Sequence, residues 1–289
     1  MSWRSLLYVP ANVPRFLERA QARGADALIL DLEDAVPDAE KSRARDLLVA
    51  HWDGLAQGSA QLVVRINADL LEAARDLDAV VRPGLKGLYV AKARGASMIA
   101  WLAAALDRLE AERGMPAGGI GLVPLLEDPT AIERAFEIAV APRVRALAFG
   151  SEDYAAACGM EPTPEALLYA RQRLVSAARA AGVAPLGLLD SVARLDHDDL
   201  ADLVRRSRAF GFAGASAIHP DTIAALNAGF LPGADSVAWA EAVLQMLAAA
   251  QADGRGTARL GGRMIDAPMA RRARDILAMA ATRGGREAG

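Results

Sequence analysis

The stretch Ala27-Leu28-Ile29-Leu30-Asp31-Leu32-Glu33-Asp34 decides the fold, because an apolar run leads directly into a cluster of carboxylates. A strand that is apolar on both faces is typical of a parallel sheet covered by helices on both sides. Similar runs recur along the chain, and segments with apolar residues at helical spacing separate them. The other runs are residues 6–10, 61–67, 87–93, 120–127, 144–153, 185–192 and 214–220.

Eight apolar runs that alternate with helices predict an α/β protein with a (β/α)8 TIM barrel rather than an open doubly wound sheet. The first run leads into Pro10-Ala11-Asn12-Val13-Pro14, which lacks the glycine fingerprint of a dinucleotide-binding turn. After the eighth run the alternation stops, and residues 234–250 predict a single helix. We therefore expect the barrel over residues 1–225 and a C-terminal helical extension, or lid, over residues 226–289.

Composition excludes several classes of protein. The 289 residues are 53% hydrophobic and 24% charged, which allows a large core and excludes global disorder. The net charge of -3 leaves no excess of positive charge for nucleic acid or an anionic membrane. The single cysteine, Cys158, excludes an intramolecular disulfide framework. No uncharged apolar run reaches the ~20 residues that span a bilayer, so we expect a soluble cytoplasmic protein.

Charged and polar side chains follow the apolar runs, where the carboxyl ends of barrel strands gather at one mouth. Carboxylates that crowd one pocket either share protons or hold a cation. With three histidines and one cysteine in the chain, an all-oxygen site for Mg²⁺ is favoured over a zinc site. The side chains concerned are Asp31, Glu33, Asp34, Arg65, Asn67, Lys92, Glu127, Glu152, Asp153, Asp190 and His219.

A series of short motifs, in this order, resembles a known family. They are Arg4-Ser5-x-Leu7-Tyr8-Val9-Pro10, Asp31-Leu32-Glu33-Asp34-Ala35-Val36 with Lys41, Val64-Arg65-Ile66-Asn67, Pro83-Gly84-Leu85-x-Gly87, Phe149-Gly150-Ser151-Glu152-Asp153, Leu168-Tyr169-Ala170-Arg171, Gly211-Phe212-x-Gly214 with Ile218-His219-Pro220, and Gly262-x-Met264-Ile265-Asp266-x-Pro268. From about residue 4 to 280 the chain resembles the citrate lyase β-subunit-like branch of the citrate lyase/aldolase superfamily, which includes malyl-CoA and citramalyl-CoA lyases. This resemblance implies a barrel with a helical lid, and a homo-oligomer, trimer or hexamer, in which the lid reaches a neighbouring subunit.

The resemblance assigns Glu127 and Asp153 as ligands of Mg²⁺, with Mn²⁺ as an alternative ion. Two carboxylates would leave coordination positions for waters and for an α-oxo or α-hydroxy acid. By spacing alone Glu152 fits as well as Asp153, and the resemblance selects Asp153. A competing interpretation of Glu127 is a negative charge at the start of a helix that begins at Pro129, where the helix dipole favours it.

Arg65 resembles the family arginine that holds a substrate carboxylate or thioester oxygen and stabilises an enolate. The alternative is a salt bridge to Asp31, Glu33 or Asp34 at the strand ends, and both can describe one interaction. By the same resemblance, Glu33 and Asp34 would accept hydrogen bonds from the waters of the metal. The alternative for these two carboxylates is a purely electrostatic role in the fold.

Arg15 and Lys41 are the candidates for binding the phosphates of CoA. The alternative is that both are solvated side chains of the barrel rim.

Asp266 precedes Pro268 and fits a helix N-cap. The resemblance to malyl-CoA-type lyases instead implies that Asp266 is the general acid/base, delivered by the lid of a neighbouring subunit. We favour catalysis for Asp266 and a structural role for His219.

The expected function is Mg²⁺-dependent cleavage, or formation, of a 3-hydroxyacyl-CoA thioester such as malyl-CoA, citramalyl-CoA or citryl-CoA. The products would be a 2-oxoacid and acetyl-CoA, another acetyl thioester or acetate. Four alternatives stay open at this point. They are the β-subunit of a citrate lyase complex, a malyl-CoA thioesterase or malate synthase-like enzyme, a pyruvate-dependent class II aldolase, and an inactive barrel that serves as a binding module.

Overall fold

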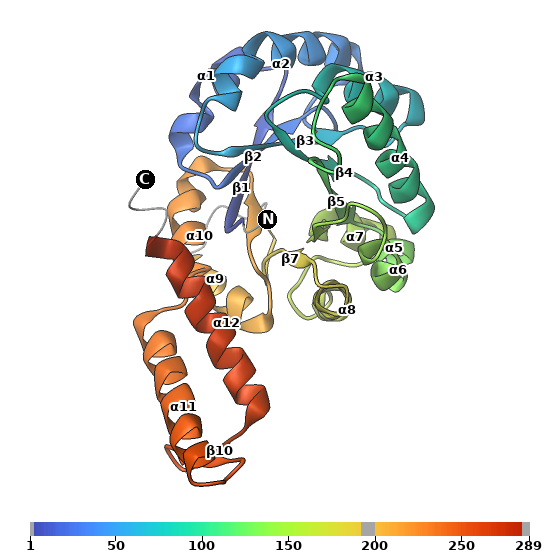
Figure 1. Cartoon of the computed structure of the whole chain (residues 1–289). Helices are drawn as coiled ribbons and strands as arrows, with labels where there is room; N and C mark the ends of the chain where they lie inside the picture. Colours follow the sequence, from blue (N-terminus) through green and yellow to red (C-terminus); the bar gives the residue numbers. More distant parts are fainter. Residues whose placement is uncertain (1–2, 192–199, 285–289) are drawn as a thin grey trace. The chain divides into compact units, whose positions relative to one another are not determined.

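The computed structural model describes residues 3–191 and 200–284, which belong to two compact units, Met1–Asn227 and Ala228–Gly289. In the first unit eight parallel strands form a barrel with helices on its outside (Figure 1). The strands neighbour one another in the order β7-β6-β5-β4-β3-β2-β1-β8, and a parallel bridge between Leu186 and Gly214 joins the two ends. The predicted (β/α)8 barrel is therefore confirmed.

The elements of the first unit alternate as the sequence pattern indicates. Its strands are β1 (Ser5–Pro10), β2 (Ala27–Asp31), β3 (Gln61–Ile66), β4 (Leu85–Val90), β5 (Gly121–Leu126), β6 (Ala146–Phe149), β7 (Ala184–Leu186) and β8 (Ala215–Ala217). Its helices are α1 (Pro14–Arg19), η1 (Gln21–Arg23), η2 (Asp38–Glu40), α2 (Lys41–Ala56), α3 (Leu70–Val80), α4 (Ala96–Glu112), α5 (Pro129–Glu133), α6 (Ala135–Ala139), α7 (Ser151–Cys158), α8 (Leu168–Ala180), α9 (Leu200–Phe210) and η3 (Pro220–Thr222). Helix α10 (Ile223–Gly229) spans the boundary between the units.

The inside of the barrel is a packed core. Side chains from β1 to β7 form one buried cluster that includes Leu6, Ile29 and Tyr89. Trp3 belongs to this cluster and donates a hydrogen bond from Nε1 to Gln61 Oε1 at 2.9 Å. Because apolar side chains fill the inside of the barrel, we expect the chemistry at the carboxyl ends of the strands, where the loops gather.

Several strands end earlier than the sequence predicts, among them β4 at Val90, β7 at Leu186 and β8 at Ala217. The run 144–153 is not one strand, because β6 ends at Phe149 and helix α7 begins at Ser151. Strand β2 ends at Asp31, so Glu33 and Asp34 lie in the loop that follows it. Val192, the predicted end of the seventh run, lies outside the described residues. In the run 144–153, Gly150 separates the end of β6 from the start of α7.

The second unit contains α11 (Ala234–Ala252), the antiparallel strands β9 (Ala258–Leu260) and β10 (Arg263–Ile265), and α12 (Ala267–Gly284). Buried side chains of α11 and α12 form its core together with Ala258 and Ile265. The sequence did not predict the hairpin of β9 and β10. Gly261 and Gly262 make its turn with φ values of 54° and 79°, which is the region that a tight two-residue turn requires.

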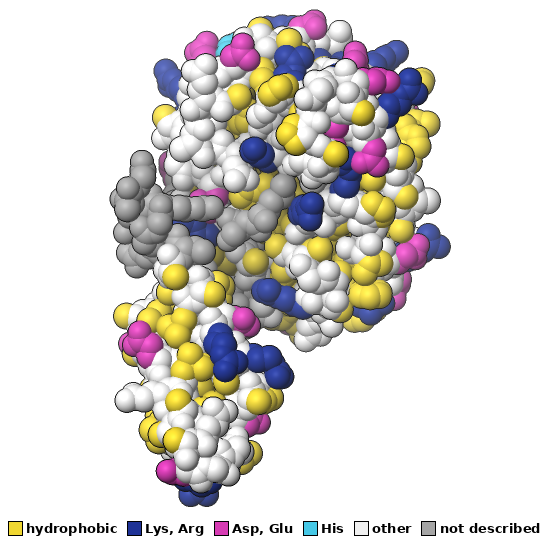
Figure 2. All heavy atoms as spheres, in the orientation of Figure 1, with side chains coloured by type: hydrophobic (Ala, Val, Ile, Leu, Met, Phe, Trp, Pro, Cys, Tyr) yellow, Lys and Arg dark blue, Asp and Glu magenta, His cyan; other side chains and the backbone are white. Residues whose placement is uncertain are grey.

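Among the described residues, no helix combines the length and the apolar character needed to cross a membrane. Figure 2 shows Lys and Arg interspersed with Asp and Glu over the face of the barrel unit that it presents. This face therefore has no extended field of one sign, in agreement with the near-neutral net charge of -3.

Candidate active site

A cavity of about 600 Å³ opens where the barrel strands end. Its apolar lining includes strand β1 and Phe16 of α1, and its polar lining includes Asp31, Arg65, Glu127 and Asp153. These polar residues come from β2, β3, the end of β5 and α7, which are far apart in the sequence. The barrel therefore brings together four of the side chains that the sequence pattern places at its mouth.

Glu127 directly follows β5, and only 4% of the residue is exposed. Its Oε1 accepts the backbone N–H of Lys92 at 2.5 Å. Its Oε2 faces Gly150, where an added Cβ would lie 2.8 Å from that oxygen, so a glycine leaves room for the carboxylate. Burial raises the pKa of Glu127 to about 8, and the negative charge of Asp153 contributes to the increase.

Asp153 and Glu152 lie in the first turn of α7 rather than on a strand, so neighbouring positions diverge by about 100° of helical rotation. The carboxylate of Glu152 accepts a hydrogen bond from the Ser191 hydroxyl. The charge of Asp153 instead contributes to the raised pKa of Glu127. Because Glu152 is engaged by Ser191, we favour Asp153 as the partner of Glu127, and this choice stays a prediction.

The carboxylate pair of Glu127 and Asp153 fits a hard divalent cation. Two negative groups that crowd a buried pocket repel one another, and a bound cation relieves that repulsion. Within residues 3–191 and 200–284, no group of three or more His, Cys, Asp or Glu is arranged to hold a metal ion. A site with two carboxylates suits Mg²⁺, which usually keeps several waters and takes further oxygens from the substrate.

Arg65 is held by three carboxylates at the edge of the cavity. Its Nε and Nη2 donate to the two oxygens of Asp31 at 2.7 and 2.5 Å, because the two residues are register partners on β2 and β3. Its Nη1 lies 3.1 Å from Glu33 and 3.5 Å from Asp34. Burial opposes the charge of Arg65, but hydrogen bonds and charge from Asp31 outweigh it and raise the pKa. Arg65 is thus both a strand-end salt bridge and a cavity residue, as the two interpretations together require.

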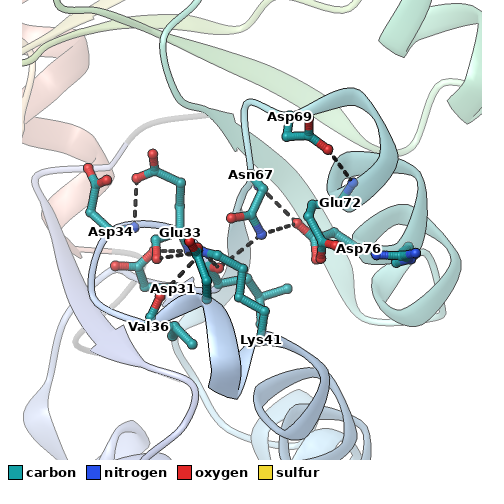
Figure 3. Close-up of polar contacts among 12 residues, drawn as sticks. Asp31, Glu33, Asp34, Val36, Lys41, Asn67, Asp69, Glu72 and Asp76 are labelled. Atoms are coloured by element: carbon teal, nitrogen blue, oxygen red, sulfur yellow. Dashed lines mark hydrogen bonds and ion pairs between the residues drawn. The ribbon is translucent and has the colours of Figure 1, made fainter.

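The loop of residues 32–36, which we call the acid loop, is held from below by Lys41. The ammonium of Lys41 donates to the carbonyl oxygens of Leu32, Glu33 and Val36 at 3.2, 3.1 and 3.3 Å (Figure 3). These contacts give Lys41 a structural role at the start of α2. The binding of CoA phosphates by Lys41 stays a prediction that this geometry does not favour.

A second support of the acid loop comes from β3 and α3. Asn67 donates from Nδ2 to the carbonyl oxygen of Leu32 at 2.9 Å and to Asp76 at 2.7 Å (Figure 3). Asp76 is fully buried and forms an ion pair of 3.0 Å with Arg45 of α2. These contacts connect the acid loop to two helices, so its carboxylates are positioned by a rigid part of the barrel.

Lys92 is a site residue that the sequence placed only at a strand end. Its ammonium donates to Glu33 at 2.8 Å and lies 3.3 Å from Asp34. The hydrogen bond with Glu33 raises the pKa of Lys92. Lys92 and Arg65 therefore share the same two carboxylates, which leaves Glu33 and Asp34 compensated by cations of the protein.

Arg15 is exposed on α1, with its guanidinium 5.0 Å from the centre of the Phe16 ring, and it does not line the cavity. Arg19 and Arg23 line the cavity instead. The sequence analysis missed these two residues, although Phe16, Arg19 and Arg23 have the spacing of one helical face. Binding of CoA phosphates by Arg15 stays a prediction.

Asp266 and His219 both have capping contacts. Asp266 accepts the N–H of Met269 at 3.3 Å, where α12 begins. The ring of His219 accepts the N–H of Asp221 at 3.3 Å at the start of η3, and His219 also lines the cavity, so its structural role stays a prediction. A cap and a catalytic role for Asp266 are compatible, because the second carboxylate oxygen is not needed for capping.

The fold and the cavity define a class: an α/β-barrel enzyme that can hold a divalent cation on paired carboxylates beside a fixed arginine. The family model of the HpcH/HpaI aldolase/citrate lyase family matches residues 4–220. The chain belongs to this family.

Relatives of known name cover nearly the whole chain. The citrate lyase subunit beta of Escherichia coli (strain K12) is 34% identical over 98% of this chain and 95% of its own length. The mitochondrial citramalyl-CoA lyase of Homo sapiens is 29% identical over 96% of this chain and 85% of its own. The crystal structure of CitE from Mycobacterium tuberculosis, in complex with magnesium, acetoacetate and coenzyme A, superposes with a TM-score of 0.78. It is 29% identical and covers 97% of this chain and 98% of its own.

Proposed function

We propose that this protein is a Mg²⁺-dependent carbon–carbon lyase acting on a 3-hydroxyacyl-CoA thioester such as malyl-CoA, citramalyl-CoA or citryl-CoA. The observation that carries the proposal is the carboxylate pair of Glu127 and Asp153 in the same cavity as Arg65. Relatives named for citrate lyase and for citramalyl-CoA lyase support it, as does a related structure with magnesium and coenzyme A. The location in the cytoplasm stays a prediction from the sequence.

The residues divide the chemistry between them. Mg²⁺ held by Glu127 and Asp153, or Mn²⁺ in its place, would act as a Lewis acid on the α-oxygen of the substrate. Arg65 stabilises the negative charge that develops on the thioester oxygen when the carbon–carbon bond breaks. As the carbon–carbon bond breaks, the substrate hydroxyl becomes the carbonyl of the 2-oxoacid and its proton passes to water. Asp266 delivers a proton to the enolate carbon of the departing acetyl-CoA, and both transfers reverse in the direction of synthesis. Glu33 and Asp34 hold Arg65. With a cation bound, they would accept hydrogen bonds from its waters.

We further propose a homo-oligomer in which residues 226–289 act as a lid and supply Asp266 to the cavity of a neighbouring subunit. The support is the position of Asp266, which follows the hairpin of β9 and β10 and precedes helix α12. A lid that closes over substrate would exclude water from the reacting carbon.

The experiment that tests the function is a product assay with malyl-CoA, citramalyl-CoA and citryl-CoA. We expect at least one substrate to yield acetyl-CoA and a 2-oxoacid in equal amounts, and EDTA to abolish the reaction. Free CoA together with the intact hydroxy acid would show thioester hydrolysis and contradict the proposal. A reaction that persists in EDTA would contradict the metal dependence.

A second candidate, the β-subunit of a citrate lyase complex, is favoured by the 34% identity to the subunit from Escherichia coli. Affinity purification of the protein from its own cells distinguishes the two. Co-purification of an acyl-carrier protein, with no activity of the isolated chain on CoA thioesters, would support the complex.

For the phosphates of CoA we predict that Arg19 and Arg23 matter and that Lys41 does not. The double variant Arg19→Ala/Arg23→Ala should raise KM for the CoA thioester about 3- to 10-fold at unchanged kcat, since partly exposed ion pairs contribute roughly 0.2–1 kcal/mol each. Steady-state kinetics measure this.

Lys41→Met should leave KM unchanged but lower the free energy of unfolding by about 1–3 kcal/mol, because buried carbonyls lose their donor. A raised KM with unchanged stability in Lys41→Met would reverse the assignment.

A further inference from the structure

Lys92 has a backbone conformation that few side chains adopt. Its φ is 51°. Among the described residues, Arg143 is the only other non-glycine residue with a positive φ. The left-handed region is disfavoured for L-residues because Cβ approaches the neighbouring carbonyl oxygen. A lysine in this conformation two residues beyond a barrel strand therefore needs surrounding contacts that hold it there.

Lys92 is held through both its side chain and its backbone. The side chain of Lys92 is tied to Glu33 at 2.8 Å and to Asp34 at 3.3 Å, on the acid loop. The backbone N–H is tied to Glu127 Oε1 at 2.5 Å. A single residue thus connects the acid loop after β2 with the carboxylate after β5.

The backbone contact determines which oxygen of Glu127 is available. Oε1 is engaged by the Lys92 amide, whereas Oε2 faces Gly150, next to the start of α7. Asp153 lies in the first turn of α7 and lines the same cavity as Glu127. The amide of Lys92 therefore leaves Oε2 of Glu127 on the side of Gly150, next to the start of α7.

We infer that Lys92 is a positioning residue of the cation site: its left-handed backbone aims an amide at Glu127 Oε1 and so directs Oε2 to the cation shared with Asp153. This inference rests on the proposed assignment of Glu127 and Asp153 as metal ligands. Its functional element is the conformation of the backbone, and the ammonium serves to hold that conformation.

A comparison of Lys92→Gly with Lys92→Val separates backbone from charge. Both variants remove the same positive charge, and Coulomb's law alone makes a divalent cation bind more tightly to both. Glycine enters the left-handed region freely, whereas a β-branched residue does so at a steric cost. With Mn²⁺ as the probe and free Mn²⁺ measured by electron paramagnetic resonance, we expect Lys92→Gly to bind as tightly as the wild type or more tightly. We expect Lys92→Val to bind about 10-fold more weakly, because its amide no longer holds Glu127.

Equal affinities of the Gly and Val variants would overturn the inference. Thermal unfolding in EDTA serves as the folding control. If Lys92→Val does not fold, the comparison is made between Lys92→Asn and Lys92→Ala instead. Asparagine tolerates the left-handed region better than alanine, so Lys92→Asn takes the place of the glycine variant. Loss of Mn²⁺ binding in Glu127→Ala tests the underlying site. If Glu127→Ala binds Mn²⁺ like the wild type, the proposed metal pair fails. If Glu127→Ala loses binding while the paired Lys92 variants do not differ, only the inference about Lys92 fails.

Discussion

Glu127→Ala and Asp153→Ala are each expected to abolish Mg²⁺-dependent cleavage while the barrel stays folded. Each variant leaves the cation with one protein carboxylate, and we expect the rate to fall by about 10³-fold or more, since a Lewis-acid metal contributes several kcal/mol to the transition state. We expect stability to change little in Glu127→Ala, because two effects oppose each other. The Lys92 N–H loses its acceptor, but the burial that raises the pKa of Glu127 to about 8 no longer disfavours a charged group. Initial rates over a range of Mg²⁺ concentrations, with circular dichroism as the folding check, measure both effects.

Glu152→Ala is the matched control. Glu152 also lines the cavity and neighbours Asp153 in α7, but its carboxylate is engaged by Ser191. We expect this variant to keep its Mg²⁺ dependence. Full activity of a metal-stripped Asp153→Ala protein would refute the assignment of the pair, and loss of Mg²⁺ binding in Glu152→Ala alone would move the ligand by one residue.

Asp266→Asn is expected to slow the chemical step by roughly 10²–10⁴-fold, the contribution typical of a general acid/base. Asparagine still accepts the N–H of Met269, so the free energy of unfolding should change by no more than ~0.5 kcal/mol on capping grounds. Single-turnover kinetics and chemical denaturation measure the two quantities separately. Near-normal turnover in Asp266→Asn would mean that the aspartate is a cap and nothing more.

Subunit mixing tests where Asp266 acts. Neither Asp266→Asn nor Glu127→Ala has a complete site, but an oligomer of both would contain some cavities with an intact metal pair and an intact aspartate from the neighbour. We expect part of the activity to return after exchange, which a mass measurement of mixed oligomers must verify. Verified exchange without recovered activity would place Asp266 in the cavity of its own subunit.

Sequence patterns were informative wherever the determining physics is local. Burial on both faces makes a barrel strand apolar along its length, so the run at residues 27–31 and its seven counterparts predicted the architecture. The carboxyl ends of those strands must converge, so Arg65 and Glu127 were expected at the mouth and do line its cavity. The Gly261-Gly262 pair is also a local signal, since two glycines between short strands are typical of a tight hairpin turn.

Local sequence patterns do not predict contacts between residues that are far apart in the sequence. Lys41 and Arg19 are both cations near the barrel rim, yet the first is held by three backbone carbonyls and the second lines the cavity. Their sequence contexts do not distinguish them, because the hydrogen-bond acceptors of Lys41 depend on how the acid loop folds. The same reason explains why Glu152 and Asp153 could not be told apart until α7 replaced the expected strand.

By itself, the sequence of this protein determined the barrel, the end of the barrel where chemistry can occur and the types of side chain collected there, because all three follow from the period and composition of each strand. Only the tertiary structure decided which oxygen faces which neighbour. Lys92, with its left-handed backbone, contacts Glu127 and Glu33, which are 35 and 59 residues away from it in the sequence. Orientation at that level is set by contacts across the barrel, and no local pattern of residues encodes it.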